Sequence, residues 1–154
     1  MKKNIAIVAG GDQSEVEVSL RSAAGIESFF NKEKYNLYVV TIIGKEWKVL
    51  CDGVKYDIDK NDFTFVCNGE KKSFDYAYIT IHGIPGEDGK LQGYFDLIGM
   101  PYSCCGVLAA ALTFNKFFCN HYLKSFGVNI AESILVRKGE AVSANDVVAK
   151  VGLP

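Results

Sequence analysis

The stretch Asn4-Ile5-Ala6-Ile7-Val8-Ala9-Gly10-Gly11 decides the fold of this chain. A short apolar run that is closed by glycine is typical of a buried strand. The β-branched and aromatic run Tyr35–Ile43 predicts a second strand. Between the two, Ser14 can cap a helix whose apolar face comprises Val16, Leu20, Ala23, Ala24 and Phe30. Strand, glycine turn, helix and strand in this order predict a βαβ unit.

The remainder of the chain predicts further strands and helices. Residues 45–69 alternate in short pieces separated by turn sequences, a pattern typical of surface hairpins or edge strands. Residues 76–81 form another run of the buried-strand type, and the apolar spacing within residues 91–98 predicts a helix. The end of the chain predicts three elements, which are one helix over residues 108–126, a strand at 134–137 and a last helix capped by Ser143.

These elements predict an α/β fold in which an open, mainly parallel sheet is flanked by helices. We assign this domain to residues 1–103 and expect an incomplete α+β segment in residues 104–154. No predicted element closes the second segment before Pro154. The expectation is therefore that the chain is a fragment or a truncated form of a longer protein.

Composition and charge exclude several classes of protein. Of the 154 residues, 49% are hydrophobic and 23% are charged, which excludes a disordered chain and predicts a buried core. The net charge of −1 gives no electrostatic footprint for nucleic acid or for an anionic membrane. The first apolar run is too short for a signal peptide, and no run approaches the roughly 20 residues that cross a bilayer. We therefore predict a soluble, cytoplasmic protein that binds neither nucleic acid nor membrane.

The cysteines number five, without a C-x-x-C pair, and there are two histidines. This set does not predict a structural zinc site. We interpret the cysteines as reduced and mostly buried small apolar residues. The alternative concerns the vicinal pair Cys104 and Cys105, because a glycine-flanked loop would expose a reactive thiol there.

A second glycine-rich stretch follows the predicted strand at residues 76–81, and it reads His82-Gly83-Ile84-Pro85-Gly86-Glu87-Asp88-Gly89-Lys90-Leu91-Gln92-Gly93. Such a loop brings backbone and a few polar groups close to a small ligand. It is not a phosphate-binding P-loop, because five residues separate Gly83 from Gly89 and Leu91 follows Lys90. The turn at Gly10 likewise lacks the G-x-G-x-x-G spacing of a dinucleotide fold.

The polar residues of the two turns have a structural and a functional interpretation. Glu15 alone is a first-turn carboxylate that stabilises a helix by about 0.3–1 kcal/mol. His82 alone is a hydrogen-bonded structural histidine, and Glu87 alone is a turn residue. A carboxylate and an imidazole at the carboxyl ends of parallel strands, however, stand where open α/β sheets bind ligands. Together they suit a small zwitterion, so we predict that both turns form one shared site.

Three motifs, taken in order along the chain, resemble the N-terminal domain of the D-alanine–D-alanine ligases. They are Gly10-Gly11-x-x-x-Glu15-x-Glu17-Val18-Ser19-Leu20, then His82-Gly83-x-x-Gly86-Glu87-Asp88-Gly89-x-Leu91-Gln92-Gly93, and then Met100-Pro101-Tyr102-Ser103-x-x-Gly106-Val107-Leu108-Ala109-x-Ala111-Leu112-x-x-x-Lys116. The resemblance covers essentially the whole chain, and the joint occurrence of the motifs makes it specific. It implies a Rossmann-like or flavodoxin-like substrate-binding domain in residues 1–103 and the beginning of the central ATP-grasp domain in residues 104–154.

The resemblance implies an ATP-dependent ligase of peptidoglycan precursor synthesis. In that family, ATP phosphorylates the carboxylate of a first D-alanine, the amine of a second D-alanine attacks the acyl phosphate, and phosphate leaves. The implied partners are D-alanine and ATP, with Mg²⁺ or Mn²⁺ held by ligands beyond residue 154. A homodimer is also implied.

The resemblance assigns roles to individual residues as well. Glu15 is expected to hold the ammonium group of the first D-alanine, Val18 to line its methyl pocket, and Glu15 and Ser19 are the catalytic candidates. Lys116 is expected to contact the phosphates of ATP, and no metal ligand is expected in this chain. The expected substrate-binding set is Glu15, Val18, His82, Gly86 and Glu87.

The chain departs from the family pattern at two places. Cys104 and Cys105 replace smaller or more polar loop residues, and Asn115 precedes Lys116 where an aspartate is usual. Close alternatives are ligases that join D-alanine to D-lactate or D-serine. A stand-alone module that binds a small amino acid is a further alternative, and a purely structural or dimerisation role is another.

Overall fold

The computed structural model describes residues 2–12 and 14–152, and it divides into two compact units. The first unit extends to Ala111 and the second begins at Leu112. The division falls within helix α3, Val107–Phe114, whereas the domain boundary expected from the sequence lies after residue 103. Among the described residues, no helix combines the length and the apolar character that spanning a bilayer requires.

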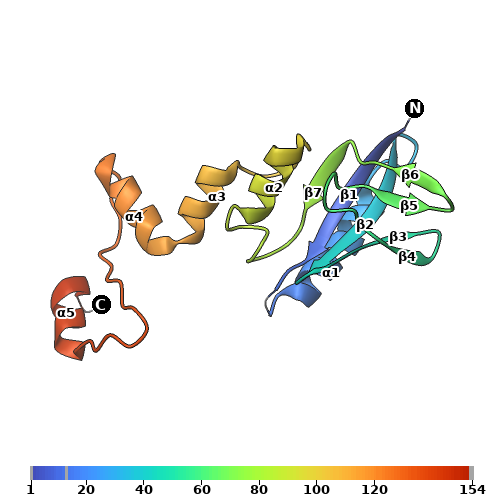
Figure 1. Ribbon diagram of the computed structural model, residues 1–154. Helices are drawn as coiled ribbons and strands as arrows, with labels where there is room; N and C mark the ends of the chain where they lie inside the picture. The colour runs from blue at the N-terminus through green and yellow to red at the C-terminus, as the bar shows by residue number, and fades with distance from the viewer. Residues whose placement is uncertain (1, 13, 153–154) are drawn as a thin grey trace. The chain divides into compact units, whose positions relative to one another are not determined.

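The first unit is built on an open five-stranded sheet (Figure 1). Its spatial order is β4-β3-β2-β1-β7, and β1 lies between two parallel neighbours, β2 and β7. On the far side of β2, β3 and β4 continue the sheet as an antiparallel meander. The strands are β1 Lys3–Gly10, β2 Tyr35–Ile43, β3 Glu46–Cys51, β4 Val54–Asp57 and β7 Tyr76–Ile79. The predicted α/β class with a parallel centre is confirmed.

One face of the sheet is covered by helix α1, Val16–Phe29. Because side chains alternate along a strand, Ile7 and Ala9 of β1 point to this face and pack with Ala23 of the helix. Two details of the predicted helix are wrong. Ser14 does not cap it, since the N-cap residue is Glu15 and no side chain makes the capping hydrogen bond, and Ala24 is exposed.

The other face of the sheet carries the larger core. Ala6 and Val8 of β1 point to this side, where a separate two-stranded ribbon and helix α2 supply aromatic side chains. Phe63 is fully buried, with its ring centroid 5.0 Å from that of Phe95. Burying one such side chain contributes about 2–3 kcal/mol. The ribbon is β5 Phe65–Cys67 with β6 Glu70–Lys72, and α2 is Lys90–Ile98.

The second unit contains helices and irregular segments only, as far as the structure describes it. The single helix expected over residues 108–126 is divided, because Asn115 adopts an extended backbone and uses its side chain to cap α4, Lys116–Ser125. The strand predicted at residues 134–137 is wrong, since their backbone pairs with no neighbouring strand among the described residues. The cap predicted for Ser143 is confirmed, because its Oγ accepts a hydrogen bond from the Asp146 amide at the start of α5, Ala144–Val151.

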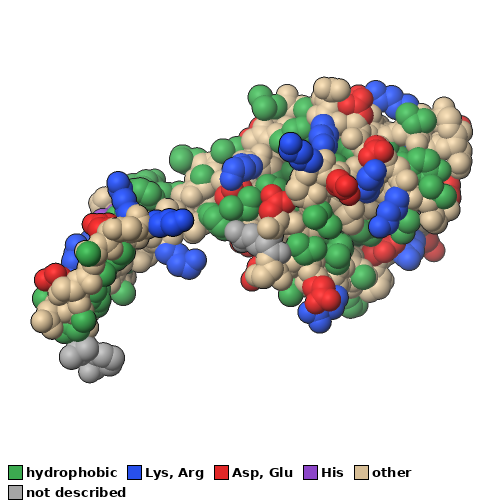
Figure 2. Space-filling view, turned by 60° about the horizontal axis from the view of Figure 1, so that its bottom comes forward, with side chains coloured by type: hydrophobic (Ala, Val, Ile, Leu, Met, Phe, Trp, Pro, Cys, Tyr) green, Lys and Arg blue, Asp and Glu red, His purple; other side chains and the backbone are tan. Residues whose placement is uncertain are grey.

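Charged side chains are interspersed over the visible face of the larger unit (Figure 2). Lysine and arginine side chains alternate there with those of aspartate and glutamate, and no extended patch of one sign forms on this face. The surface therefore adds no feature that attracts a polyanion to this face.

Candidate active site

The glycine turn after β1 is held by the end of β2. Gly10 has φ 115°, and a Cβ at this position would lie 2.3 Å from the carbonyl oxygen of Ile42. The next amide, that of Gly11, donates a 2.8 Å hydrogen bond to the same oxygen. Only glycine fits so close an approach between two backbones, so this part of the sequence motif is set by the packing of strands.

Ser19 ties the ends of β1 and β7 to helix α1. Its fully buried hydroxyl donates a 2.9 Å hydrogen bond to the Thr80 carbonyl and accepts one of 3.0 Å from the Gly10 amide. Thr80, directly after β7, donates its own hydroxyl to the Val8 carbonyl at 3.0 Å. These contacts bring together the carboxyl ends of two parallel strands, where ligands bind to open α/β sheets.

The loop that begins at His82 lies directly against the Gly10-Gly11 turn. The Asp12 amide donates a 3.0 Å hydrogen bond to the Ile84 carbonyl. A Cβ on Gly11 would lie 3.1 Å from the Ile81 side chain and 3.5 Å from the His82 carbonyl oxygen. The predicted meeting of the two glycine-rich stretches is therefore present in the structure, and backbone atoms form the junction.

The loop also has its own internal bracing. The Glu87 carboxylate accepts a 3.0 Å hydrogen bond from the Gly83 amide, while the Glu87 amide donates to the Gly83 carbonyl at 2.8 Å. A Cβ on Gly86 would lie 2.5 Å from the Ile81 carbonyl oxygen, so the chain cannot carry a side chain there without moving. Glu87 therefore shapes the loop, and one of its oxygens is already engaged.

The side chains expected to bind the substrate differ in how exposed they are and in whether their polar groups already form hydrogen bonds. Glu15 is the exposed N-cap residue of α1, and Val18 lies on the first turn of this helix, where it is 42% exposed. His82 is half-buried at the start of the loop. Within residues 2–12 and 14–152, neither the Glu15 carboxylate nor the His82 imidazole is used in a hydrogen bond. Both groups are thus free to bind a ligand.

Lys116 belongs to the second unit, where it is the exposed first residue of α4. It forms no ion pair with the described residues, whereas Lys124 of the same helix pairs with Glu132. A free ammonium group at this position fits a phosphate oxygen. The two carboxylates of the glycine loop are not free to bind a metal ion as Lys116 is free to bind a phosphate. Asp88 pairs with Lys90, and Glu87 accepts a hydrogen bond from the Gly83 amide.

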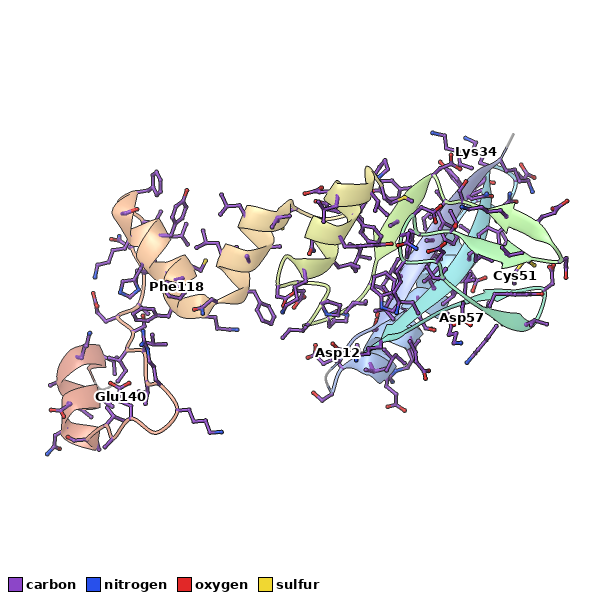
Figure 3. The ribbon with its side chains drawn as sticks, in the orientation of Figure 1. Asp12, Lys34, Cys51, Asp57, Phe118 and Glu140 are labelled. Atoms are coloured by element: carbon purple, nitrogen blue, oxygen red, sulfur yellow. The ribbon has the colours of Figure 1, made fainter. Side chains whose placement is uncertain are left out.

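Three further polar residues hold this edge together, and none of them is among the residues expected from the sequence. Thr80 is a buried polar residue within an apolar run, a signal that could have indicated its role. Asp12 accepts a 2.7 Å hydrogen bond from the Gly44 amide, which joins the turn to the end of β2 (Figure 3 labels Asp12). Gln92 is buried and donates a 2.6 Å hydrogen bond to the Gly86 carbonyl, but helical spacing alone gives no sign of this contact.

Comparison with known proteins agrees with the geometry of this α/β ligand-binding edge. The chain belongs to the family described as D-ala D-ala ligase N-terminus, whose model matches residues 4–105. It is 67% identical to a D-alanine--D-alanine ligase of Bacteroides fragilis over an alignment of 155 positions, which covers 100% of this chain and 48% of that relative. A ligase of the same name from Bacteroides thetaiotaomicron is 64% identical, with the same coverage. The chain thus spans about half the length of the curated relatives it matches.

Solved structures give the same result for the fold. D-alanyl-alanine synthetase A from Vibrio cholerae superposes with a TM-score of 0.73 at 30% identity, covering 82% of this chain and 38% of that one. The VanG D-Ala:D-Ser ligase from Enterococcus faecalis gives 0.74 at 25% identity, covering 86% and 44%. D-alanine--D-alanine ligase from Bacillus anthracis complexed with ATP gives 0.72 at 25% identity, covering 96% and 45%.

Proposed function

We propose that this chain serves in an ATP-dependent D-alanine–D-alanine ligase and that its first unit binds the first D-alanine. The observation that carries the proposal is the junction of the Gly10-Gly11 turn with the His82 loop, which leaves the Glu15 and His82 side chains uncommitted beside it. The 67% identity to a ligase over the whole chain supports it and favours it over a stand-alone binding module or a purely structural protein.

In the proposed mechanism, the residues of this chain position a small zwitterion. The Glu15 carboxylate takes the ammonium group of D-alanine, while Val18 contacts its methyl group. His82, Gly86 and Glu87 line the other side of the same pocket, which we call the D-alanine corner. Holding the amino acid in one orientation presents its carboxylate for reaction, and such positioning supplies much of the catalysis in transfer reactions of this kind.

Ser19 is assigned a positioning role in this proposal. Its hydroxyl donates to Thr80 and accepts from Gly10, and it is fully buried, so it holds the first turn of α1 against the strand ends. The Ser19 amide, in turn, donates a 3.0 Å hydrogen bond to the Glu15 carbonyl oxygen. Ser19 thus acts on the substrate through the placement of Glu15.

ATP supplies the phosphoryl group that converts the D-alanine carboxylate into an acyl phosphate. The amine of the second D-alanine then forms the peptide bond, loses a proton, and displaces phosphate. Lys116 is the residue of this chain that we assign to the ATP phosphates, because its ammonium group is exposed and unpaired among the described residues. The proposal includes divalent metal ions only because the family resemblance implies them, and their ligands are expected beyond residue 154.

The same corner would serve a ligase with a different second substrate. The structural similarity to a D-Ala:D-Ser ligase shows that one fold hosts more than one acceptor. Product analysis of the full-length enzyme with D-alanine, D-serine and D-lactate separates these alternatives. A dominant D-alanyl-D-alanine product is the expected result, and we expect this chain alone to be inactive.

Two further properties stay predictions from the family resemblance. We propose a cytoplasmic protein, because the reaction consumes ATP, and a homodimer. Light scattering of the purified protein tests the dimer directly, and the mass of a monomer at all concentrations would contradict it.

The site itself is tested by a titration of the isotope-labelled chain with D-alanine. We expect amide shifts at Gly11, Glu15 and His82, with a weaker response to L-alanine. Glu15→Gln should weaken D-alanine binding about tenfold, since the charge partner of the ammonium group is lost. Glu17→Gln is the matched control, because Glu17 is an exposed acid of the same helical turn. Equal losses in both variants would remove Glu15 from the site.

A further inference from the structure

Two cysteines that the candidate active site does not use lie in contact within the larger core. Cys51 is the last residue of β3 and Cys67 is the last residue of β5. Their sulfur atoms are 2.8 Å apart, and the two residues are only 5% and 0% exposed. Cys51 is labelled in Figure 3. Its strand belongs to the main sheet, whereas Cys67 belongs to the separate ribbon.

Charged groups surround this pair although it is buried. The Asp52 carboxylate lies 3.8 Å from each of the two sulfur atoms. The Lys72 ammonium group of β6 lies 3.9 Å from the Cys51 sulfur. An ammonium group favours the thiolate form of a cysteine, and a carboxylate can accept the proton that a thiol releases. The cluster therefore contains the groups that thiol chemistry needs.

The spacing of the sulfur atoms distinguishes between two uses of the cluster. Cys51, Asp52 and Cys67 place their ligand atoms close enough together to surround a metal ion. Two thiolates bound to one tetrahedral zinc ion, however, are about 3.8 Å apart, since each Zn–S bond is about 2.3 Å. The observed 2.8 Å is much shorter than this and closer to the bond of about 2 Å in a disulfide. The geometry favours a bond between the sulfur atoms over a shared metal.

We propose that Cys51 and Cys67 form a reversible intramolecular disulfide when the protein meets a hydroperoxide. The Cys51 thiolate attacks one oxygen of hydrogen peroxide, which gives a sulfenic acid and releases hydroxide. The Cys67 sulfur then displaces the hydroxyl group from Cys51, so that the S–S bond forms and water leaves. In total, two thiols lose two protons and two electrons, and one peroxide is reduced to two waters. Cys51 reacts first because it is next to Lys72 and is the less buried of the two.

The rate of this oxidation should rise with pH. Burial raises the pKa of the Cys51 thiol to about 11, its contact with Cys67 and the charge of Asp52 act in the same direction, and Lys72 opposes them. The other groups that face the pair are Tyr38 of β2 and Tyr56 of β4. Burial raises the pKa of Tyr38 above its ordinary value of 10, and the contact with Cys67 raises that of Tyr56, so both phenols are neutral at pH 7. The reactive thiolate is therefore scarce at neutral pH, and the pair resists mild oxidants there.

The proposal is tested by peptide mapping of the wild-type chain after treatment with hydrogen peroxide. Trypsin places Cys51 in residues 49–55 and Cys67 in residues 61–71, while Cys104 and Cys105 share residues 91–116. We expect the first two peptides to appear as one linked species, lighter by two hydrogen atoms and separated by dithiothreitol. Blocking free thiols with iodoacetamide before the digest prevents exchange between peptides.

Two further measurements test the disulfide, one by peptide mapping of cysteine variants and one by thermal melting of the wild type. Cys51→Ala and Cys67→Ala should each abolish the linked species, whereas Cys119→Ser should leave it unchanged. In the wild type, the oxidised form should melt roughly 5–10 °C above the reduced form, because the bond closes a loop of the unfolded chain. Adding dithiothreitol should reverse this shift.

Three outcomes would overturn the proposal. One is oxidation of Cys104 and Cys105 with residues 49–55 and 61–71 remaining unlinked. Another is a linked species that joins Cys51 or Cys67 to any other cysteine. The third is stoichiometric zinc bound by the untreated chain with full protection of both thiols, which would assign the cluster to a metal.

Discussion

The two compact units of this chain use similar residues in different ways. In the first unit, six consecutive residues of β1 are buried, and the strand pairs on both sides. In the second unit, α4 and α5 have no buried residue, and Phe126 is 68% exposed. The first unit is therefore held by tertiary contacts, while the helices of the second are defined by their own caps. The difference shows that a clear sequence pattern predicts an element without predicting what stabilises it.

The largest expected effect comes from Gly10→Ala, which should lower the unfolding free energy of the first unit by about 3–5 kcal/mol. The new Cβ would meet the Ile42 carbonyl oxygen at 2.3 Å. The single tryptophan, Trp47, packs against Tyr94 in this unit, so its fluorescence in urea reports on the first unit alone. Gly53→Ala is the control in the same unit, since Gly53 also has positive φ but no atom within 4 Å of the added Cβ. Similar losses in the two variants would mean that backbone strain, not close packing, determines the cost.

The next effect concerns Ser19→Ala, which should cost about 1–3 kcal/mol because it leaves the Gly10 amide and the Thr80 carbonyl without a buried partner. Ser28→Ala removes an exposed hydroxyl of the same helix, which donates to the Gly25 carbonyl, and it should change the urea midpoint very little. A Ser19→Ala midpoint equal to the wild type would remove this residue from the set that positions α1.

A smaller effect is expected in the second unit from Asn115→Ala. Loss of its hydrogen bond to the Phe118 amide should destabilise the start of α4 by about 1 kcal/mol. Carbon chemical shifts at residues 116–119 should move towards coil values, while the Trp47 midpoint stays constant. Asn120→Ala, inside the same helix, controls for the loss of an amide side chain. A shifted Trp47 midpoint would show that the two units are coupled in stability.

The smallest effect at neutral pH is expected from the titration of Cys51. Its folded pKa is raised to about 11 from the ordinary value of 9, so the folded state binds the proton more tightly than the unfolded state does. The contribution of Cys51 to the free energy of unfolding is therefore constant below pH 9. It falls as the pH rises from 9 through 11. Urea midpoints measured from pH 7 to 11 check this, and Cys51→Ala should flatten the decline.

Much of the first unit was predictable because its elements carry strong local signals. The apolar runs and the two glycine-rich stretches locate β1, β2, β7 and the loop edge correctly. The ribbon and the aromatic core depend on contacts distant in sequence, such as Phe63 with Phe95, and no local pattern specifies them. In the second unit, the capping preference of Asn115 overrode a continuous apolar spacing, which explains why one helix was expected where two exist.

The candidate site was predictable in its location and less so in its construction. Glycine and polar residues after two strands indicated a shared edge, and the structure places both turns there. The buried contacts of Ser19 and Thr80 could not be read from spacing, because they depend on how two strand ends approach a helix. The roles of Glu15, Val18, His82 and Lys116 toward a substrate remain predictions.

The backbone junction between Asp12 and Ile84 has a consequence for protein engineering. Because carbonyl and amide groups form the joint, the side chains at positions 82 and 15 can be exchanged without dismantling the frame that presents them. Inserting or deleting one residue between Ile81 and Gly86 would instead shift the acceptor away from its donor. A library that keeps the length of this loop and varies only the uncommitted side chains beside the junction is therefore the practical way to change which small ligand the proposed site binds.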